Sequence, residues 1–132
     1  MPHITIEYSA NVAEHHDIDA LVAAVHTSAL DHGLPPADGL RTRAAQRDHY
    51  LVADGSPVLA FIAIAIRIGP GRDAATKTDF IETVLDAAEA QIDRDSGPLA
   101  IAWSIELNEI DADFRINRNH VRRHLNALKE DN

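Results

Sequence analysis

The sequence has no cysteine, which excludes disulfide bridges, thiol nucleophiles and cysteine-based metal sites. It also lacks the continuous apolar run of roughly 18 residues that a membrane-spanning helix needs, and it lacks the basic and apolar segments of a signal peptide. We therefore expect a soluble cytoplasmic protein without a membrane partner. A length of 132 residues is enough for one domain with its own core, so we assign residues 1–132 to a single domain.

Positive charge is scarce in this chain. It contains 21 acidic residues against 12 lysines and arginines, and its formal net charge is −9. This balance argues against a nucleic-acid partner. Lysine is especially rare, because only Lys77 and Lys129 occur and the other ten basic residues are arginine. The planar arginine side chain binds carboxylates through two parallel hydrogen bonds, so an acidic protein with focal arginines is suited to an anionic small molecule.

The first half of the chain predicts a strand, a helix and a second strand. Polar and apolar side chains alternate over residues 3–8, which is typical of a strand with one buried face. A polar connection begins at Ser9, and Asp17 is a suitable N-cap for a helix that extends to about His32. Residues 40–52 then predict a long, polar strand.

The second half repeats this order. Asp54-Gly55 predicts a hairpin-type turn, and residues 58–68 predict a strand with an isoleucine face and a face of mostly small residues. To the second face we assign Ala60, Phe61, Ala63, Ala65 and Arg67. Asp73 is a candidate cap for a second helix, which Ser96-Gly97-Pro98 ends. Residues 99–107 alternate again and predict a fourth strand.

Residues 3–53 and 58–107 are thus two β-α-β units of similar length, followed by a short amphipathic helix at about residues 117–129. Because right-handed crossovers place both long helices on the same side, we expect an α/β (α+β) fold in which two helices cover one face of a four-stranded sheet. The sequence predicts no helix long enough to cover the other face. Association with other copies of the chain is the simplest way to bury that face.

Pro2 directly precedes the first predicted strand. If Met1 is removed, Pro2 becomes a terminal secondary amine, and α-amino groups titrate near neutrality. Burial in an apolar pocket lowers the pKa of such a cationic acid further, so the amine would suit a base that works at neutral pH. If Met1 is retained, the Pro2 nitrogen is an amide without basicity. Arg41 and Arg43, two positions apart on a predicted strand, point to one face.

Several segments together carry a resemblance to a known family. They are Pro2-His3 before an apolar strand, Gly39-Leu40-Arg41-Thr42-Arg43, Ala53-Asp54-Gly55, and Ala60-Phe61 leading to Ile68-Gly69-Pro70-Gly71-Arg72. In this order and spacing the chain resembles the 5-carboxymethyl-2-hydroxymuconate isomerases, a branch of the tautomerase superfamily. The resemblance covers nearly the whole chain, although residues 108–118 match only loosely.

The resemblance implies a tautomerase fold with a four-stranded mixed sheet, and a homotrimer whose sheets form a central barrel. It implies no cofactor, no metal, and a site near each N-terminal proline to which a neighbouring subunit contributes. The implied reaction moves a proton from the 2-hydroxyl group of a dienol tricarboxylic acid to a distant carbon and gives the conjugated 2-oxo isomer, in the breakdown of homoprotocatechuate (4-hydroxyphenylacetate). Pro2 is then the catalytic base and acid, and Arg41 and Arg72 are catalytic cationic donors. Arg43 and His3 are candidates for binding the substrate.

Three other functions remain open at this point. The chain could have another activity of the tautomerase superfamily, on a phenylpyruvate-type enol or a halogenated acrylate. It could be a trimer that binds an acidic metabolite without catalysis, which retention of Met1 would favour. It could also be a ferredoxin-like interaction module, which would be monomeric or dimeric.

The remaining histidines and arginines predict no further site. His120 and His124 have the spacing of a two-histidine metal face, but no cysteine or HExxH glutamate accompanies them, so we expect a solvated pair. We also place four other histidines on the surface, and we expect three arginines near the C-terminus to pair with acidic neighbours. These residues are His15, His16, His26 and His32, and Arg118, Arg122 and Arg123.

Overall fold

The computed structural model describes residues 2–94 and 97–130 of the chain. Its elements are β1 (His3–Ser9), α1 (Ala10–His15), α2 (Ile18–His32), β2 (Arg41–Arg47), β3 (Leu59–Ile68), α3 (Ala74–Asp93), β4 (Ala100–Glu109), a 3-10 turn η1 (Ala112–Phe114) and α4 (His120–Glu130). Among these elements, none of the helices has the length and apolar character to span a bilayer.

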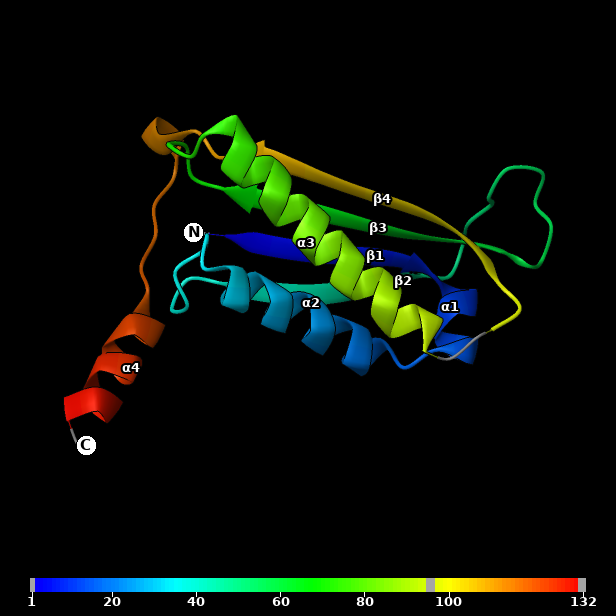
Figure 1. The fold of residues 1–132 in the computed structure, drawn as a ribbon, viewed down its shortest axis with the longest axis horizontal. Coiled ribbons are helices and arrows are strands. Elements are labelled where there is room, and N and C mark those ends of the chain that lie inside the picture. Colours follow the sequence, from blue (N-terminus) through cyan, green and yellow to red (C-terminus); the bar gives the residue numbers. More distant parts are fainter. Residues whose placement is uncertain (1, 95–96, 131–132) are drawn as a thin grey trace.

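The four strands form one mixed sheet in the order β2-β1-β3-β4. β2 pairs parallel with β1, β4 pairs parallel with β3, and β1 and β3 are antiparallel. The helices α2 and α3 lie side by side over one face of this sheet (Figure 1). The prediction of two β-α-β units that build a four-stranded α+β fold is therefore confirmed.

Local signals set the ends of both long helices. The carboxylate of Asp17 accepts a hydrogen bond from the backbone N–H of Ala20, and Gly33 ends α2 with a φ of 84°. Asp73 caps α3 in the same way through the N–H of Thr76. α3 ends at Asp93, and Ser96, part of its predicted stop, lies outside the described residues.

The core lies between the helices and the inner face of the sheet. The isoleucines of β3 at positions 62, 64, 66 and 68 are at most 2% exposed, and Phe80 of α3 is fully buried against them. Ala60 was assigned to the opposite face of β3, and this was wrong. It is fully buried with the isoleucines, because residues two positions apart along a strand point to the same face of the sheet.

The prediction of a long second strand and a hairpin was wrong in two respects. β2 ends at Arg47, where its partner β1 ends at Ser9, so the following residues have no strand to pair with. Residues 52–55 do turn, with Gly55 donating to the carbonyl of Val52 at 2.8 Å. The turn is not a hairpin because β1 lies between β2 and β3.

The connection predicted after Ser9 instead contains the short helix α1. Its buried residue Asn11 explains why it forms. The side-chain amide of Asn11 donates to the carbonyl of Leu59 at 2.8 Å, and its side-chain oxygen accepts from the hydroxyl of Ser9 at 2.7 Å. The Ser9 hydroxyl in turn accepts from the N–H of Phe61 at 3.0 Å. These bonds tie α1 to the start of β3, a contact that the local sequence pattern does not encode.

Three of the four histidines assigned to the surface are wholly or partly buried. His16, which follows α1, is 8% exposed. His26 bonds the hydroxyl of Thr42 on β2 through Nδ1 at 2.8 Å, and Nε2 of His32 contacts the carboxylate of Asp79 on α3 at 2.8 Å. Both histidines lie on the flank of α2, where they are half-buried against neighbouring elements.

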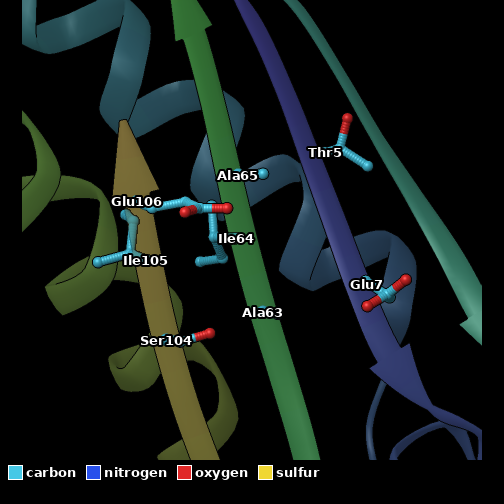
Figure 2. A pocket seen from close by; sticks show the side chains of 8 residues that line it. All are labelled: Thr5, Glu7, Ala63, Ile64, Ala65, Ser104, Ile105 and Glu106. Carbon is cyan, nitrogen blue, oxygen red and sulfur yellow. The ribbon is translucent and has the colours of Figure 1, made fainter. Parts of the chain in front are cut away.

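The other face of the sheet carries polar side chains between its alanines. Figure 2 shows this face, with helices behind the sheet and the side chain of Glu106 extending from β4 toward β3. A cavity of about 450 Å³ lies here and is lined by Thr5, Glu7, Ala63, Ile64, Ala65, Ser104, Ile105 and Glu106. Small residues were expected on this face, but it also carries the carboxylates of Glu106 and Glu7, and that of Glu7 accepts a hydrogen bond from Nε of Arg47 at 2.7 Å.

The C-terminal segment leaves the end of β4 and passes the end of the sheet that carries the N-terminus (Figure 1). We call residues 110–122 the tail. It is attached at both ends, because Ile110 donates to the carbonyl of Ile68 at 2.7 Å and Asn119 donates to the carbonyl of Asp38 at 2.8 Å. Arg122, at the start of α4, also pairs with the carboxylate of Asp38, which confirms the expected acidic neighbour for this arginine.

Candidate active site

Pro2 is buried at one end of the sheet and lines a cavity of about 240 Å³. We call it the Pro2 cavity. Because β3 is antiparallel to β1, the end of β3 and the turn that follows it lie beside the start of β1. The loop between α2 and β2 reaches the same end of the sheet (Figure 1). The other lining residues are Leu34, Pro35, Pro36, Ile68, Gly69, Pro70, Arg72, Arg115, Asn117 and Arg122.

Three arginines surround the Pro2 cavity. Arg72 donates one hydrogen bond, from Nη2 to the carbonyl of Leu34 at 3.2 Å, and Arg122 pairs with Asp38. The guanidinium group of Arg115 lies over Gly69, since a Cβ atom at position 69 would be only 3.2 Å from its Nη2. In the described part of the chain neither Arg72 nor Arg115 has a carboxylate partner. The cavity therefore attracts anions and disfavours an ammonium group at Pro2.

A second cavity of about 440 Å³ adjoins the first and shares Arg115 and Asn117 with it. We call it the basic cavity. His3 pairs in register with Arg41 on β2 and with Arg67 on β3, which places these three side chains next to one another on one face of the sheet. The tail forms the opposite wall. The lining residues are His3, Arg41, Arg67, Ile110, Phe114, Arg115, Ile116, Asn117 and Arg118.

The surroundings of His3 favour the neutral form of its imidazole ring. Burial lowers the pKa of His3 from its ordinary value of 6.5, and the nearby charges of Arg43, Arg67 and Arg41 lower it further. Nη1 of Arg43 lies 3.2 Å from Nδ1 of His3. Because arginine only donates hydrogen bonds, Nδ1 is the acceptor and the proton of the neutral ring is on Nε2. His3 can thus donate a hydrogen bond to an anion without adding charge.

The structure separates the residues that the sequence grouped into one site. Pro2 and Arg72 share the Pro2 cavity, whereas Arg41 and His3 line the basic cavity. The backbone N–H of Arg41 does bond the carbonyl of Pro2, at 3.2 Å, but its side chain follows that of His3 to the outer face of the sheet. Arg43 lines neither cavity and contacts His3 instead.

Met1 lies outside the described residues. Its removal, on which a free amine at Pro2 depends, stays a prediction.

Five charged or polar lining residues were not predicted from the sequence as parts of a site. Arg115 and Asn117 lie in the tail, where the family resemblance is loose, and Arg118 and Arg122 were expected only to pair with acidic neighbours. Arg67 was counted only as a face residue of its strand. The concentration of arginine at positions 115–123 of an acidic chain could have pointed to the tail, but not to Arg67.

The chemistry of the two cavities is that of an anion site. Within residues 2–94 and 97–130, no group of three or more histidine, aspartate or glutamate side chains is placed to hold a metal ion. The groups that face the cavities are guanidinium donors, a neutral imidazole, an amide and a buried proline. Such a set can bind carboxylates and stabilise charge that develops on an oxygen atom.

Comparison with known proteins agrees with this chemistry. The family model for 5-carboxymethyl-2-hydroxymuconate isomerase matches residues 2–125. The 5-carboxymethyl-2-hydroxymuconate Delta-isomerase of Escherichia coli is 26% identical over 121 residues, which are 92% of this chain and 96% of that protein. A crystal structure of a 5-carboxymethyl-2-hydroxymuconate delta-isomerase is similar with a TM-score of 0.85 and 24% identity, over 95% of this chain and 93% of that chain.

A more distant similarity concerns the fold alone. A fused 4-OT, described as a symmetric trimer, has a TM-score of 0.65 and 15% identity, over 89% of this chain and 92% of that chain. Since the family model extends from Pro2 over nearly the full chain, including both halves of the sheet and the tail, the protein belongs to the 5-carboxymethyl-2-hydroxymuconate isomerase family, within the tautomerase superfamily.

Proposed function

We propose that this protein converts 5-carboxymethyl-2-hydroxymuconate to its conjugated 2-oxo isomer in the breakdown of homoprotocatechuate, with Pro2 as the proton carrier. The observation that carries the proposal is a buried Pro2 in a cavity that is also lined by Arg72 and Arg115, which have no carboxylate partner among the described residues. A polycarboxylate substrate needs such cations, and a proton transfer at neutral pH needs a base of this kind. The reaction requires no cofactor.

The proposed mechanism has two proton transfers. The neutral Pro2 amine takes the proton from the 2-hydroxyl group of the substrate, which becomes a dienolate. The same nitrogen then delivers that proton to the distant carbon, so the oxygen ends as a carbonyl and Pro2 is neutral again. Arg72 stabilises the negative charge that develops between the two transfers. Arg41, from the basic cavity, binds a carboxylate that keeps its charge throughout.

The mechanism needs Pro2 to be an unprotonated amine before substrate binds. Two features of the site favour this state. Pro2 is buried, and desolvation disfavours the charged ammonium form. The guanidinium groups of Arg72 and Arg115 line the same cavity, and like charges disfavour it further. Removal of Met1 is the remaining requirement.

We propose further that the protein is a homotrimer whose sheets face one another around a central axis. Two features support this arrangement. One face of the sheet packs under α2 and α3, while the other carries the alanines and hydroxyl groups of the cavity in Figure 2. The fused 4-OT whose fold is similar is described as a symmetric trimer. In a trimer of this kind a neighbouring subunit adds side chains to each site. Sedimentation equilibrium of the purified chain tests the assembly, and a monomer or dimer would contradict it.

The function is tested by mass and by rate. The intact mass of the purified protein should show loss of Met1, because retention would leave Pro2 as an amide. Pro2→Ala should then lower kcat for ketonisation of the dienol tricarboxylate by about 10²–10⁴-fold, the range of a general acid–base group. Turnover of this variant at the parental rate, with sedimentation unchanged, would exclude Pro2 as the proton carrier. Phenylenolpyruvate and a haloacrylate, assayed in parallel, distinguish the proposed substrate from those of other tautomerases.

A further inference from the structure

The two helices that cover the sheet carry parts of the wall of the Pro2 cavity at their ends. α2 ends at His32, and residues 34–36, which follow it closely, line the cavity. The turn over residues 69–72 supplies another part of the wall, and α3 begins at Ala74, two positions after Arg72. The relative position of these two helix ends therefore sets the relative position of the two parts of the wall.

His32 joins the end of α2 to α3. Its Nε2 lies 2.8 Å from Oδ2 of Asp79, and because a carboxylate only accepts hydrogen bonds, Nε2 is the donor. Nδ1 of His32 is buried without a partner in the part of the chain that the structure describes, so the bond to Asp79 is the one hydrogen bond of the ring there. The ring also packs edge-on against Phe80, with the ring centroids 5.1 Å apart.

The direction of the Arg72 side chain depends on the segment that follows His32. Within residues 2–94 and 97–130, the one hydrogen bond of Arg72 goes from Nη2 to the carbonyl of Leu34, at 3.2 Å. Leu34 follows His32 by two positions, and Arg72 precedes α3 by two. If the two helix ends move apart, the carbonyl of Leu34 moves away from Arg72, and the guanidinium group loses its fixed direction.

We propose that His32 is a positioning residue for the reaction, whose hydrogen bond to Asp79 holds the carbonyl of Leu34 where it orients the guanidinium group of Arg72. His32 is not among the residues that line the Pro2 cavity, so it acts through Arg72 and not on the substrate. The inference rests on the proposed function for the role of Arg72. It gives a task in the reaction to a histidine that the sequence pattern placed on the surface.

The bond from His32 contributes little to the stability of the whole fold. The helices are already held on the sheet by apolar side chains, since Val25 of α2 and Val84 of α3 are fully buried in the core. The side chain of Asp79 is 72% exposed, so water competes for its carboxylate. We therefore expect loss of the bond to change the reaction rate while the midpoint of urea unfolding changes little.

Two variants remove the bond in different ways. His32→Phe keeps an aromatic ring against Phe80 but has no donor, and Asp79→Ala removes the acceptor from an exposed position. His32→Gln is the conservative variant, because its side-chain amide can donate in place of Nε2. His15→Phe is the matched control, since His15 is exposed on α1 at the opposite end of the sheet (Figure 1).

The rate of ketonisation of the dienol tricarboxylate is the first measurement. His32→Phe and Asp79→Ala should each lower kcat by about tenfold and change KM by less than about twofold, because Arg72 acts on charge that develops only during the reaction. His32→Gln should recover most of the lost rate, and His15→Phe should match the parent enzyme.

A double-mutant cycle separates positioning from a purely structural role. In the Arg72→Ala background, His32→Phe should lower kcat by less than about twofold, because the group through which His32 acts is absent. The proposal is overturned if His32→Phe has the parental kcat, if His32→Gln is as slow as His32→Phe, or if the full loss of rate persists without Arg72.

A second measurement does not need turnover. The Nε–Hε signal of Arg72 in a nitrogen–proton NMR spectrum, assigned by its absence from Arg72→Ala, should shift in His32→Phe and in Asp79→Ala and stay in place in His15→Phe. If the parent enzyme does not ketonise the dienol tricarboxylate but the signal shifts in this way, the proposed function is wrong and the positioning of Arg72 stands. If the enzyme turns over but neither the signal nor kcat responds to loss of the bond, the function stands and the positioning is wrong.

Discussion

Arg72 offers the most direct measure of how much one cation contributes to this site. Its side chain has five N–H donors, and the structure uses one of them in the bond to the carbonyl of Leu34. Within residues 2–94 and 97–130 the remaining donors have no partner, so a ligand in the Pro2 cavity can accept hydrogen bonds from them. A hydrogen bond to a charged group contributes about 1.5–3 kcal/mol, so Arg72→Ala should lower kcat/KM for the dienol tricarboxylate by about 10-fold to 150-fold.

A second substitution at the same position separates charge from geometry. Arg72→Lys keeps the positive charge but loses the planar pair of donors, and it should recover only part of the loss. The bond to Leu34 is a single, partly buried one, so the free energy of unfolding should fall by only about 0.5–1.5 kcal/mol in Arg72→Ala. Urea unfolding therefore shows whether the kinetic effect is local.

The assay is the initial rate of ketonisation at low and at high salt, with Arg94→Ala as the control for the loss of one positive charge. The ratio of kcat/KM of the parent enzyme to kcat/KM of Arg72→Ala should fall as the salt concentration rises, because ions screen a partly exposed cation. A loss in kcat/KM no greater than that of Arg94→Ala would refute the assignment of Arg72 to the site. Full recovery of the rate by Arg72→Lys would instead contradict the need for the planar pair of donors, since a point charge would then be sufficient.

Three further predictions concern stability and the tail. Asn11→Ala should lower the free energy of unfolding by about 1–3 kcal/mol in urea titrations, because Ser9 and Leu59 lose a buried partner; a change below about 0.5 kcal/mol would contradict this. The pKa of His3 is lowered on folding, so the unfolded chain binds a proton at His3 more readily, and the free energy of unfolding declines as pH falls below 6.5. His3→Gln should make this decline shallower between pH 7 and 5. Identical slopes of the free energy of unfolding against pH in the parent and the variant would exclude the effect. Asp38→Asn should speed trypsin cleavage in the tail several-fold relative to Asp31→Asn, and equal rates would show that Asp38 does not tether it.

Features with local causes were predictable. Asp17 and Asp73 each offer a carboxylate to a backbone N–H three residues later, and both helices start where the caps indicate. The alternation in β1, β3 and β4 follows from the period of a strand and correctly separates buried from outward residues, apart from the misassigned Ala60. Features with distant causes were missed. α1 depends on a bond from Asn11 to Leu59, and β2 stops at Arg47 because β1 has ended.

The sequence by itself determined the two β-α-β units and the family, because capping, alternation and motif spacing are all properties of neighbouring residues. It also offered Pro2, Arg41 and Arg72 as candidates for the site. Only the tertiary structure decided which arginines lie around Pro2. The tail reaches the site through contacts between residues 81 positions apart, and strand register turns the side chain of Arg41 toward His3 and Arg67. Packing of this kind depends on the whole sheet, so the division of the site into two cavities has no counterpart in any local pattern.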